Sequence, residues 1–381
     1  MLPLDKNEEG HGCRFFSLKD KTSLALRSFP EAFSESRCVG SSHGWLVLLD
    51  KASEPYLLNP LRGGWVLRLP PVKTFPCVLQ VVRSDEDGEG RGSAAFYEAV
   101  HLGRWRTTTL LSLPTLREYI ISKAVLSASP NGDDQGNGCW VVVIFGNESK
   151  LAFCGCRDFV GGGAWTELTG NRAPYSDVMF YHGTLFALSN AGFVEVWDFN
   201  RDSPVKIMEI KSSFPRKSAE AARALRNLCF TNTYLVEAGS EILLLVRFAG
   251  YFVNRHGVPV EEDYLLTEED THPLVCPYRT LYFHVYMLDM NSEEWIGLDS
   301  IGDRAVFVGG SHSRSVSARE FPEIEANSVY FTDDNWDPVE RDDLYGGHDM
   351  GVYSFQSGKV KEICELGSDK VEPPPFWVFP F

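Results

Sequence analysis

The stretch Trp45-Leu46-Val47-Leu48-Leu49-Asp50, followed by Pro55-Tyr56-Leu57-Leu58-Asn59-Pro60 and Trp65-Val66-Leu67-Arg68-Leu69-Pro70, decides the fold. Each segment is rich in apolar residues and is bounded by Gly, Pro, Asn or Asp. This pattern is typical of short strands joined by tight turns. Residues 38–44 lead into the first segment and predict one more strand. We therefore expect a four-stranded antiparallel unit over residues 38–70.

The same pattern returns along the chain. His43-Gly44 separates the first and second predicted strands of the first unit, and His182-Gly183 holds the same place in a later unit. We interpret both histidines as turn residues because each precedes a glycine at hairpin spacing. The other predicted sets cover residues 120–168, 176–210, 227–298 and 304–366. Residues 13–18 and 23–27 resemble the last two strands of a set.

Units of four strands that repeat along a chain predict a single all-β domain, a β-propeller. Five full sets and one split set indicate about six blades, with five to seven possible. We expect the N-terminal half-set to share a blade with a C-terminal strand, Phe376-Trp377-Val378-Phe379, which closes the ring. Residues 1–12 are predicted to be a short tail and residues 13–381 the propeller. A pair of β-sandwich domains is the alternative, but no Pro/Ser-rich linker separates two halves.

One segment breaks the strand pattern. Residues 215–226 are rich in Ala, Arg and Lys, which predicts a short helix in an insertion.

Composition restricts the partners. The 381 residues include 36 Lys and Arg against 52 Asp and Glu, which gives a formal net charge of −16. This charge disfavours binding to nucleic acid and to anionic membranes. No apolar run approaches the roughly 20 residues of a membrane span, and the N-terminus lacks a signal peptide. We expect an intracellular protein, in the cytoplasm, the nucleus or both, whose nine cysteines are mostly buried free thiols.

Residues 333–349 carry seven acids and two aromatic residues. So many carboxylates cannot be desolvated together, so we expect this segment on a rim of the ring. Aromatic side chains within a negative field suit the binding of a basic protein. A solubilising loop without a partner is the alternative. The predicted partner-binding residues are Asp333, Asp334, Trp336, Asp337, Asp342, Asp343 and Tyr345.

The sequence predicts no catalytic residue, no cofactor and no metal site. An EF-hand loop that began at Asp333 would need Gly at its sixth place and Glu at its twelfth, where Pro338 and Leu344 stand. Cys154-Gly155-Cys156 has no second pair at zinc spacing. No nucleophile elbow, phosphate loop or HExxH sequence is present.

Two stretches carry a family resemblance. The first is Cys38-Val39-Gly40-Ser41-Ser42-His43-Gly44-Trp45-Leu46-Val47, with Leu58-Asn59-Pro60 after it. The second is Gly302-Asp303-Arg304-Ala305-Val306-Phe307-Val308-Gly309, with Asn327-Ser328-Val329-Tyr330-Phe331-Thr332-Asp333-Asp334 and Asp349-Met350-Gly351-Val352-Tyr353. Together they resemble the plant F-box-associated domain of unknown function 295 (DUF295), the KIB-type β-propeller family. The resemblance covers nearly the whole chain and implies the substrate-recognition half of a ubiquitin-ligase receptor.

Members of this family often begin with an F-box, a helical hairpin that binds the ligase adaptor. Residues 1–12 contain no leucine-rich helical pattern. We therefore expect target binding, and no adaptor binding by the sequence as it stands.

Two functions are compatible with these patterns. The first is a non-enzymatic protein-binding propeller, because the loops of a propeller face form a broad, rigid platform. The second is a propeller enzyme, a hydrolase or lyase with its site in the central channel. An enzyme would need converging His and carboxylate side chains, whereas the predicted inner strands supply mainly apolar and hydroxyl residues.

Overall fold

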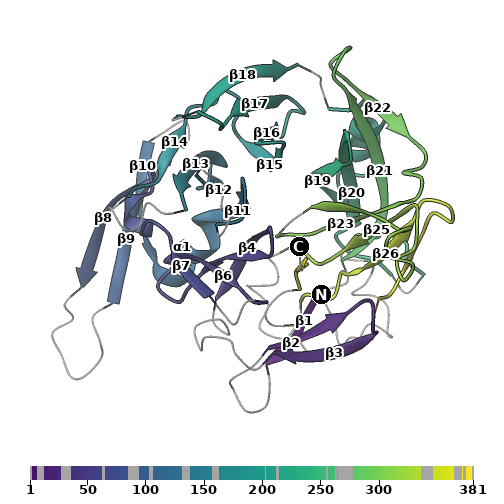
Figure 1. The fold of residues 1–381 in the computed structure, drawn as a ribbon, viewed down its shortest axis with the longest axis horizontal. Coiled ribbons are helices and arrows are strands. Elements are labelled where there is room, and N and C mark those ends of the chain that lie inside the picture. Colours follow the sequence, from purple (N-terminus) through teal and green to yellow (C-terminus); the bar gives the residue numbers. More distant parts are fainter. Residues whose placement is uncertain are drawn as a thin grey trace.

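The computed structural model describes residues 2–6, 13–26, 36–61, 65–84, 94–102, 106–130, 138–156, 163–201, 203–211, 214–254, 256–261, 264, 278–311, 313–335, 346–363, 371 and 375–379. These residues include a ring of β-sheets, mostly antiparallel, around a central axis (Figure 1).

Five sheets form the blades of the ring. Blade 1 is β4(Arg37–Ser42), β5(Trp45–Leu49), β6(Pro55–Asn59) and β7(Trp65–Arg68). Blade 2 is β11(Ile121–Leu126), β12(Trp140–Phe145), β13(Lys150–Gly155) and β14(Thr166–Leu168). Blade 3 is β15(Tyr175–Tyr181), β16(Thr184–Ser189), β17(Val194–Asp198) and β18(Val205–Ile210). Blade 4 is β19(Cys229–Ala238), β20(Glu241–Gly250), β21(Arg279–Asp289) and β22(Glu294–Leu298). Blade 5 is β23(Arg304–Val308), β24(Arg314–Ser317), β25(Ser328–Phe331), β26(Gly351–Ser354) and β27(Lys359–Lys361).

The first strand of each of blades 1 to 4 lies nearest the axis, and neighbouring inner strands pack against one another. Blade 5 has the order β24-β23-β25-β26-β27, and β24 packs beside β19. The Ser41 N–H donates to the Ser311 carbonyl at 3.2 Å and joins blade 1 to blade 5. The all-β propeller is confirmed. The described residues form five blades, one fewer than the expected six and within the expected range of five to seven.

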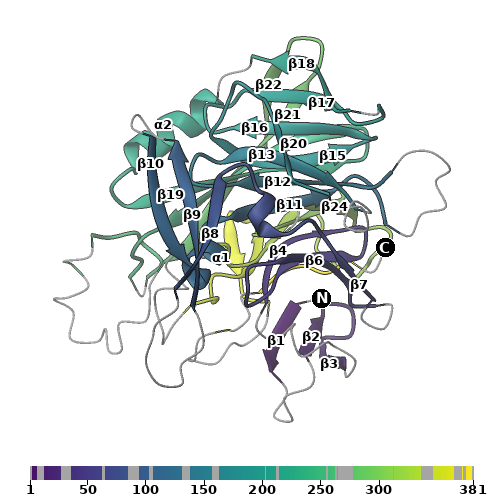
Figure 2. The same cartoon turned by 90° about the vertical axis from the view of Figure 1, so that its left-hand side faces the viewer.

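The expected sixth blade does not form, because the N-terminal strands pair with one another. Among the described residues, β1(Leu2–Lys6), β2(Cys13–Ser17) and β3(Thr22–Leu26) form a separate three-stranded sheet (Figure 2). Strand β1 falls in the segment that we expected to be a tail. Residues 375–379 form no strand, so the expected closure by a shared N- and C-terminal blade is wrong.

Side chains of the C-terminal segment occupy the junction between blades 5 and 1 instead. Phe376 and Val378 pack against the apolar residues of blade 1, whereas Trp377 packs against blade 5. The Trp377 indole N–H donates to the Val308 carbonyl at 3.0 Å. Phe16 of β2 also lies against the blade 5 cluster.

Blades 1 and 2 are separated in sequence by a further sheet. Strands β8(Val78–Ser84), β9(Ala94–Leu102) and β10(Arg106–Ser112) form it outside the ring, because β4 contacts β11 directly. Helix α1(Leu113–Tyr119) follows it, with the Ser112 hydroxyl accepting from the Thr115 N–H. The predicted helix is confirmed as α2(Arg216–Ala224). A short 3-10 turn, η2(Val72–Thr74), follows β7.

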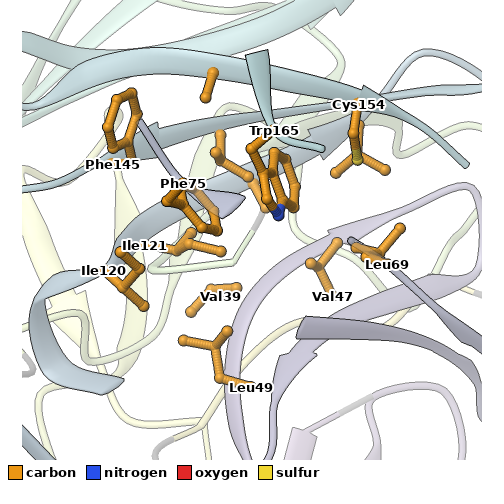
Figure 3. Close-up of a cluster of buried hydrophobic side chains, with 14 of the residues drawn as sticks. Val39, Val47, Leu49, Leu69, Phe75, Ile120, Ile121, Phe145, Cys154 and Trp165 are labelled. Carbon is orange, nitrogen blue, oxygen red and sulfur yellow. The ribbon is translucent and has the colours of Figure 1, made fainter. Parts of the chain in front are cut away.

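The core lies between blades. Figure 3 shows the cluster between blades 1 and 2, in which side chains such as Val47 and Leu49 face Ile121 and Phe145. The Phe75 and Trp165 rings stack there with centroids 4.6 Å apart. Both faces of an inner strand are therefore buried, which explains the uniformly apolar runs in the sequence.

The predicted turn histidines are confirmed. His43 and Gly44 have φ angles of 52° and 75°, and His182 and Gly183 have φ angles of 48° and 75°. A two-residue hairpin with positive φ at both positions matches the twist of the flanking strands.

The cysteines differ in part from expectation. Cys139 and Cys156 form a disulfide, so the free-thiol prediction is wrong for this pair. Cys38, Cys77 and Cys229 are free thiols. Burial raises the pKa of the Cys38 thiol to about 12, which makes it unreactive. Within the described residues, no helix has the length and apolar character that crossing a membrane requires.

Candidate functional site: the mouth of the central channel

A cavity of about 500 Å³, here called the mouth cavity, opens where β11, β15 and β19 begin. Residues from blades 2, 3, 4 and 5 line it, so it lies on the axis of the ring. Its wall is mostly polar. The lining residues are Ser122, Lys123, Ser176, Asn190, Phe214, Thr231, Asn232, Thr233, Tyr234, Gly309, Gly310 and Asp334.

One charged pair beside this cavity ties three blades together. Lys123 of β11 bonds to Asp177 of β15, whose side chain is fully buried. The other oxygen of Asp177 accepts from the Leu235 N–H of β19 at 2.6 Å. Burial raises the pKa of the Asp177 carboxyl, although Lys123 and two backbone N–H groups act in the opposite direction.

A second charged cluster joins blades 4 and 5. Arg247 of β20 is 1% exposed. Its guanidinium donates to Asp334 at 2.8 Å and to Asp349 at 2.8 Å. It also donates to the Thr332 carbonyl at 3.0 Å and lies over the Phe331 ring. A rigid guanidinium fork suits such a set of partners, because it presents several donors in fixed directions.

The Asp334 carboxylate lies on the cavity side of this cluster and is 8% exposed. It accepts from the Asn232 amide and the Tyr234 hydroxyl as well as from Arg247. Asp334 is therefore held by three side chains of blade 4.

Asp333 lies behind Asp334 and is 1% exposed. One of its oxygens accepts from the Tyr278 hydroxyl and from the Asp349 N–H, and the other accepts from the Asn335 N–H. Burial, followed by the negative charge of Asp349, raises the pKa of Asp333 to about 7. This cluster holds three carboxylates for one guanidinium, so a proton on Asp333 relieves the excess negative charge.

Of the seven predicted partner-binding residues, the structure describes two. Asp333 and Asp334 lie at the inner end of the channel mouth and not on a solvated rim, so the expected exposure is wrong for them. The reason is that Arg247 compensates their charge. The other five, Trp336, Asp337, Asp342, Asp343 and Tyr345, lie outside the described residues.

The structure fixes where that acidic segment leaves the ring and returns to it. Asn335 is bonded through its N–H to Asp333, and the Asp349 N–H is bonded to the same carboxylate. The Gly346 carbonyl accepts from the Val371 N–H at 3.0 Å. The described residues that flank residues 336–345 are thus held in place beside the mouth cavity.

A second cavity of about 270 Å³ lies where β4 and β11 end, at the other end of the inner strands. Glu237, Arg314 and His43 contribute its charged and titratable side chains. Burial, and then the charge of Arg314, lowers the pKa of His43.

One Ser–His pair has the composition of a hydrolytic dyad. The Ser218 hydroxyl of α2 lies 2.8 Å from Nδ1 of His284 and 2.7 Å from the Tyr286 hydroxyl. Ser218 is fully buried, so a substrate cannot reach it. The pair is better explained as the polar contact that attaches α2 to blade 4.

Sequence reasoning missed Lys123, Asp177 and Arg247. The available signal was a single charge inside an apolar strand, as in Leu243-Leu244-Leu245-Val246-Arg247-Phe248. Charged residues are almost never fully buried unless they are paired. Such a residue therefore predicts a buried partner from elsewhere in the chain.

The sequence profile of the KIB1-4 β-propeller matches residues 15–354. The chain belongs to this family. The match covers all five blades up to β26, which agrees with the ring described above.

Among curated relatives, the F-box protein SKIP23 of Arabidopsis thaliana is 28% identical over 222 residues, which cover 56% of this chain and 48% of that protein. The F-box/kelch-repeat protein KIB1 of the same plant is 21% identical over 365 residues, which cover 93% of this chain and 70% of KIB1. The F-box protein KIB4, also from Arabidopsis thaliana, is 23% identical over 323 residues, covering 84% of this chain and 66% of KIB4. The match to SKIP23 thus spans about half of that relative's length.

Proposed function

We propose that this KIB-type propeller is a non-enzymatic target-recognition module of a plant F-box ubiquitin-ligase receptor. The F-box relatives support the receptor role, and the acidic segment supports the recognition role. The observation that carries the proposal is that Asn335 and Asp349, which flank the acidic residues 336–345, both donate their backbone N–H groups to the Asp333 carboxylate beside the channel mouth. This supports recognition, because binding residues commonly lie on connecting segments that a rigid scaffold holds in place.

The proposed target is a protein with a basic surface, in the cytoplasm or the nucleus. Trp336 and Tyr345 would supply apolar anchors, and Asp337, Asp342 and Asp343 the negative field, whereas Asp334 is paired with Arg247. Complementary charge raises the association rate more than it raises the affinity. The alternative of a channel enzyme gains no support from the relatives, and Lys123 and Asp334 at the mouth already have ion-pair partners.

The test is charge reversal of the acidic segment. After a target is identified by affinity capture, its association rate is measured for the parent chain and for the triple variant Asp337→Lys, Asp342→Lys and Asp343→Lys. We expect the association rate of the triple variant at low salt to be at least tenfold lower than that of the parent chain, and to depend less on salt. The reason is that exposed charges attract a partner over a distance and that salt screens this attraction.

The matched control reverses three exposed acids near the outer edge of blade 4, Glu293→Lys, Glu294→Lys and Asp299→Lys. This control changes the net charge equally. Equal rates for the two triple variants would show that total charge matters and that the acidic segment has no specific role.

A further inference from the structure

The mouth cavity has a lining that differs from an ordinary apolar ligand pocket. The hydroxyls of Thr231 and Thr233 and the amide of Asn190 face it, and the structure gives these side chains no hydrogen bond to another described residue. The Ser122 and Ser176 hydroxyls make only long bonds, of 3.3 and 3.4 Å, to carbonyls of their own blades. The wall thus holds both donors and acceptors.

Each of the two charged side chains in the wall is neutralised by an ion-pair partner. Lys123 is paired with Asp177, and Asp334 is paired with Arg247. An anionic ligand would have to compete with Asp177 for Lys123, and a cationic ligand would have to compete with Arg247 for Asp334. Neither competition is favourable, since breaking a buried pair leaves an uncompensated charge.

These groups can still bind neutral hydroxyls. An ammonium carries three donors, and Asp177 is the one described acceptor of Lys123. Successive side chains of β19 point to opposite faces of the strand, so this strand contributes to two parts of the cavity wall. Asn232 and Tyr234 face blade 5, where they hold Asp334, so Thr231 and Thr233 face the blade 3 side.

We infer that the mouth cavity binds a neutral, polyhydroxylated small molecule of the size of a monosaccharide or a cyclitol. Each hydroxyl of such a ligand both donates and accepts, which matches a wall of mixed donors and acceptors without net charge. The Phe214 ring supplies an apolar surface for the C–H face of a sugar ring. A volume of about 500 Å³ lies within the usual range for small-molecule sites.

The experiment measures binding to the full chain by saturation-transfer NMR and by calorimetry. The probes are D-glucose, D-galactose and myo-inositol, with glucose 6-phosphate and glucosamine as charged comparators. We expect saturable binding of at least one neutral probe and weaker binding of its charged comparator.

Two nearly isosteric substitutions then locate the site. Thr231→Val and Thr233→Val each remove one hydroxyl from the wall, and each should weaken binding at least fivefold. Thr166→Val on the outer strand β14 is the control, since Thr166 is exposed and far from the cavity. Melting temperatures of all variants establish that each one folds.

Three results would overturn the inference. They are no saturable binding of any neutral probe, tighter binding of a charged comparator, or equal affinity in the wall variants and the control. If no probe binds and Thr233→Val instead weakens the binding of the protein target, the cavity belongs to the target-binding surface. Recognition of the protein target can fail or succeed independently, because its test uses residues 337–343.

Discussion

At the residue scale, Arg247 holds the junction between blades 4 and 5. Replacing it with Met would leave the carboxylates of Asp334 and Asp349 buried without a counter-charge. We expect the free energy of unfolding to fall by about 3 to 5 kcal/mol, as is typical when one partner of a buried ion pair is removed. Arg247→Lys should recover only part of the loss because it lacks the planar fork. Urea denaturation measures the free energy of unfolding of both variants.

Arg304→Met is the matched control for this prediction. Arg304 pairs with Glu241 at 2.6 Å across the same two blades, but the two side chains are 30% and 40% exposed. Removing an exposed pair should cost less than about 1 kcal/mol. Similar losses for the Arg247 and Arg304 variants would contradict a special role for the buried cluster.

The raised pKa of Asp333 predicts that the stability of the protein depends on pH. Its pKa is about 7 in the folded chain and close to the ordinary 3.8 when unfolded, so the folded state binds the proton more tightly between these values. The stabilisation is complete below about pH 4 and is lost as the pH rises through about 7, with a change on the order of a few kcal/mol.

Denaturation midpoints measured from pH 4.5 to 8 test this sign. Asp333→Asn should flatten the fall in stability with rising pH, because an amide does not titrate. Asp299→Asn, which changes an exposed carboxylate, should retain the parent slope. An unchanged slope in Asp333→Asn would assign the pH dependence to other groups.

At the element scale, the closest approach of two inner strands depends on Gly40 of β4. A Cβ atom at this position would lie 2.2 Å from the Ala124 carbonyl oxygen of β11. Because the obstacle is backbone, Gly40→Ala must push β4 and β11 apart, and we expect a loss of about 1 to 3 kcal/mol. Gly138→Ala is the control, since no atom lies within 4 Å of its Cβ position. Equal unfolding midpoints for the two variants would contradict this packing.

Strands that are apolar on both faces were predictable from the sequence. The predicted segments 45–50 and 55–60 match β5 and β6 to within one residue. Helix α1 was not expected, although Ser112 followed by Pro114 is a recognisable helix start. The extra strand β24 was missed because Arg314-Ser315-Val316-Ser317 has little apolar character. Local pattern cannot show which distant strands pair, so the N-terminal sheet was wrongly assigned to a shared blade.

The candidate site was less predictable than the fold. The acidic content of residues 333–349 is visible in the sequence, but the burial of Asp333 and Asp334 depends on Arg247, about 85 residues earlier. Nothing local indicates that pairing. A charge pattern therefore identifies an unusual segment, whereas its solvent exposure is decided by partners from other blades.

At the scale of the whole molecule, polar contacts link every pair of neighbouring blades. Blades 1 and 2 are joined by the Leu126 N–H and the Ser42 hydroxyl at 3.3 Å, and blades 5 and 1 by Ser41 and Ser311. Asp177 links blades 2, 3 and 4, and Arg247 links blades 4 and 5. A closed ring with these links should unfold in one cooperative transition.

The C-terminal segment is the most direct test of closure. Trp377→Ala removes a side chain that is 1% exposed between blades 5 and 1, and we expect a loss of about 3 to 5 kcal/mol. Trp65→Ala on the outer strand of blade 1, where Trp65 is 58% exposed, should change stability by less than about 1 kcal/mol. Thermal unfolding, monitored by circular dichroism, distinguishes the two variants. An unchanged melting temperature for Trp377→Ala would show that the ring closes without this segment.

The anchoring of residues 336–345 also bears on how such proteins diversify. Asp333 and Asp349, on either side of this segment, belong to a buried cluster whose described partners, Arg247 and Tyr278 among them, come from blade 4. Lengthening a surface loop costs little, since the closure penalty grows only with the logarithm of its length. Insertions and substitutions between Asp333 and Asp349 can therefore accumulate while the buried cluster and the ring around it stay unchanged.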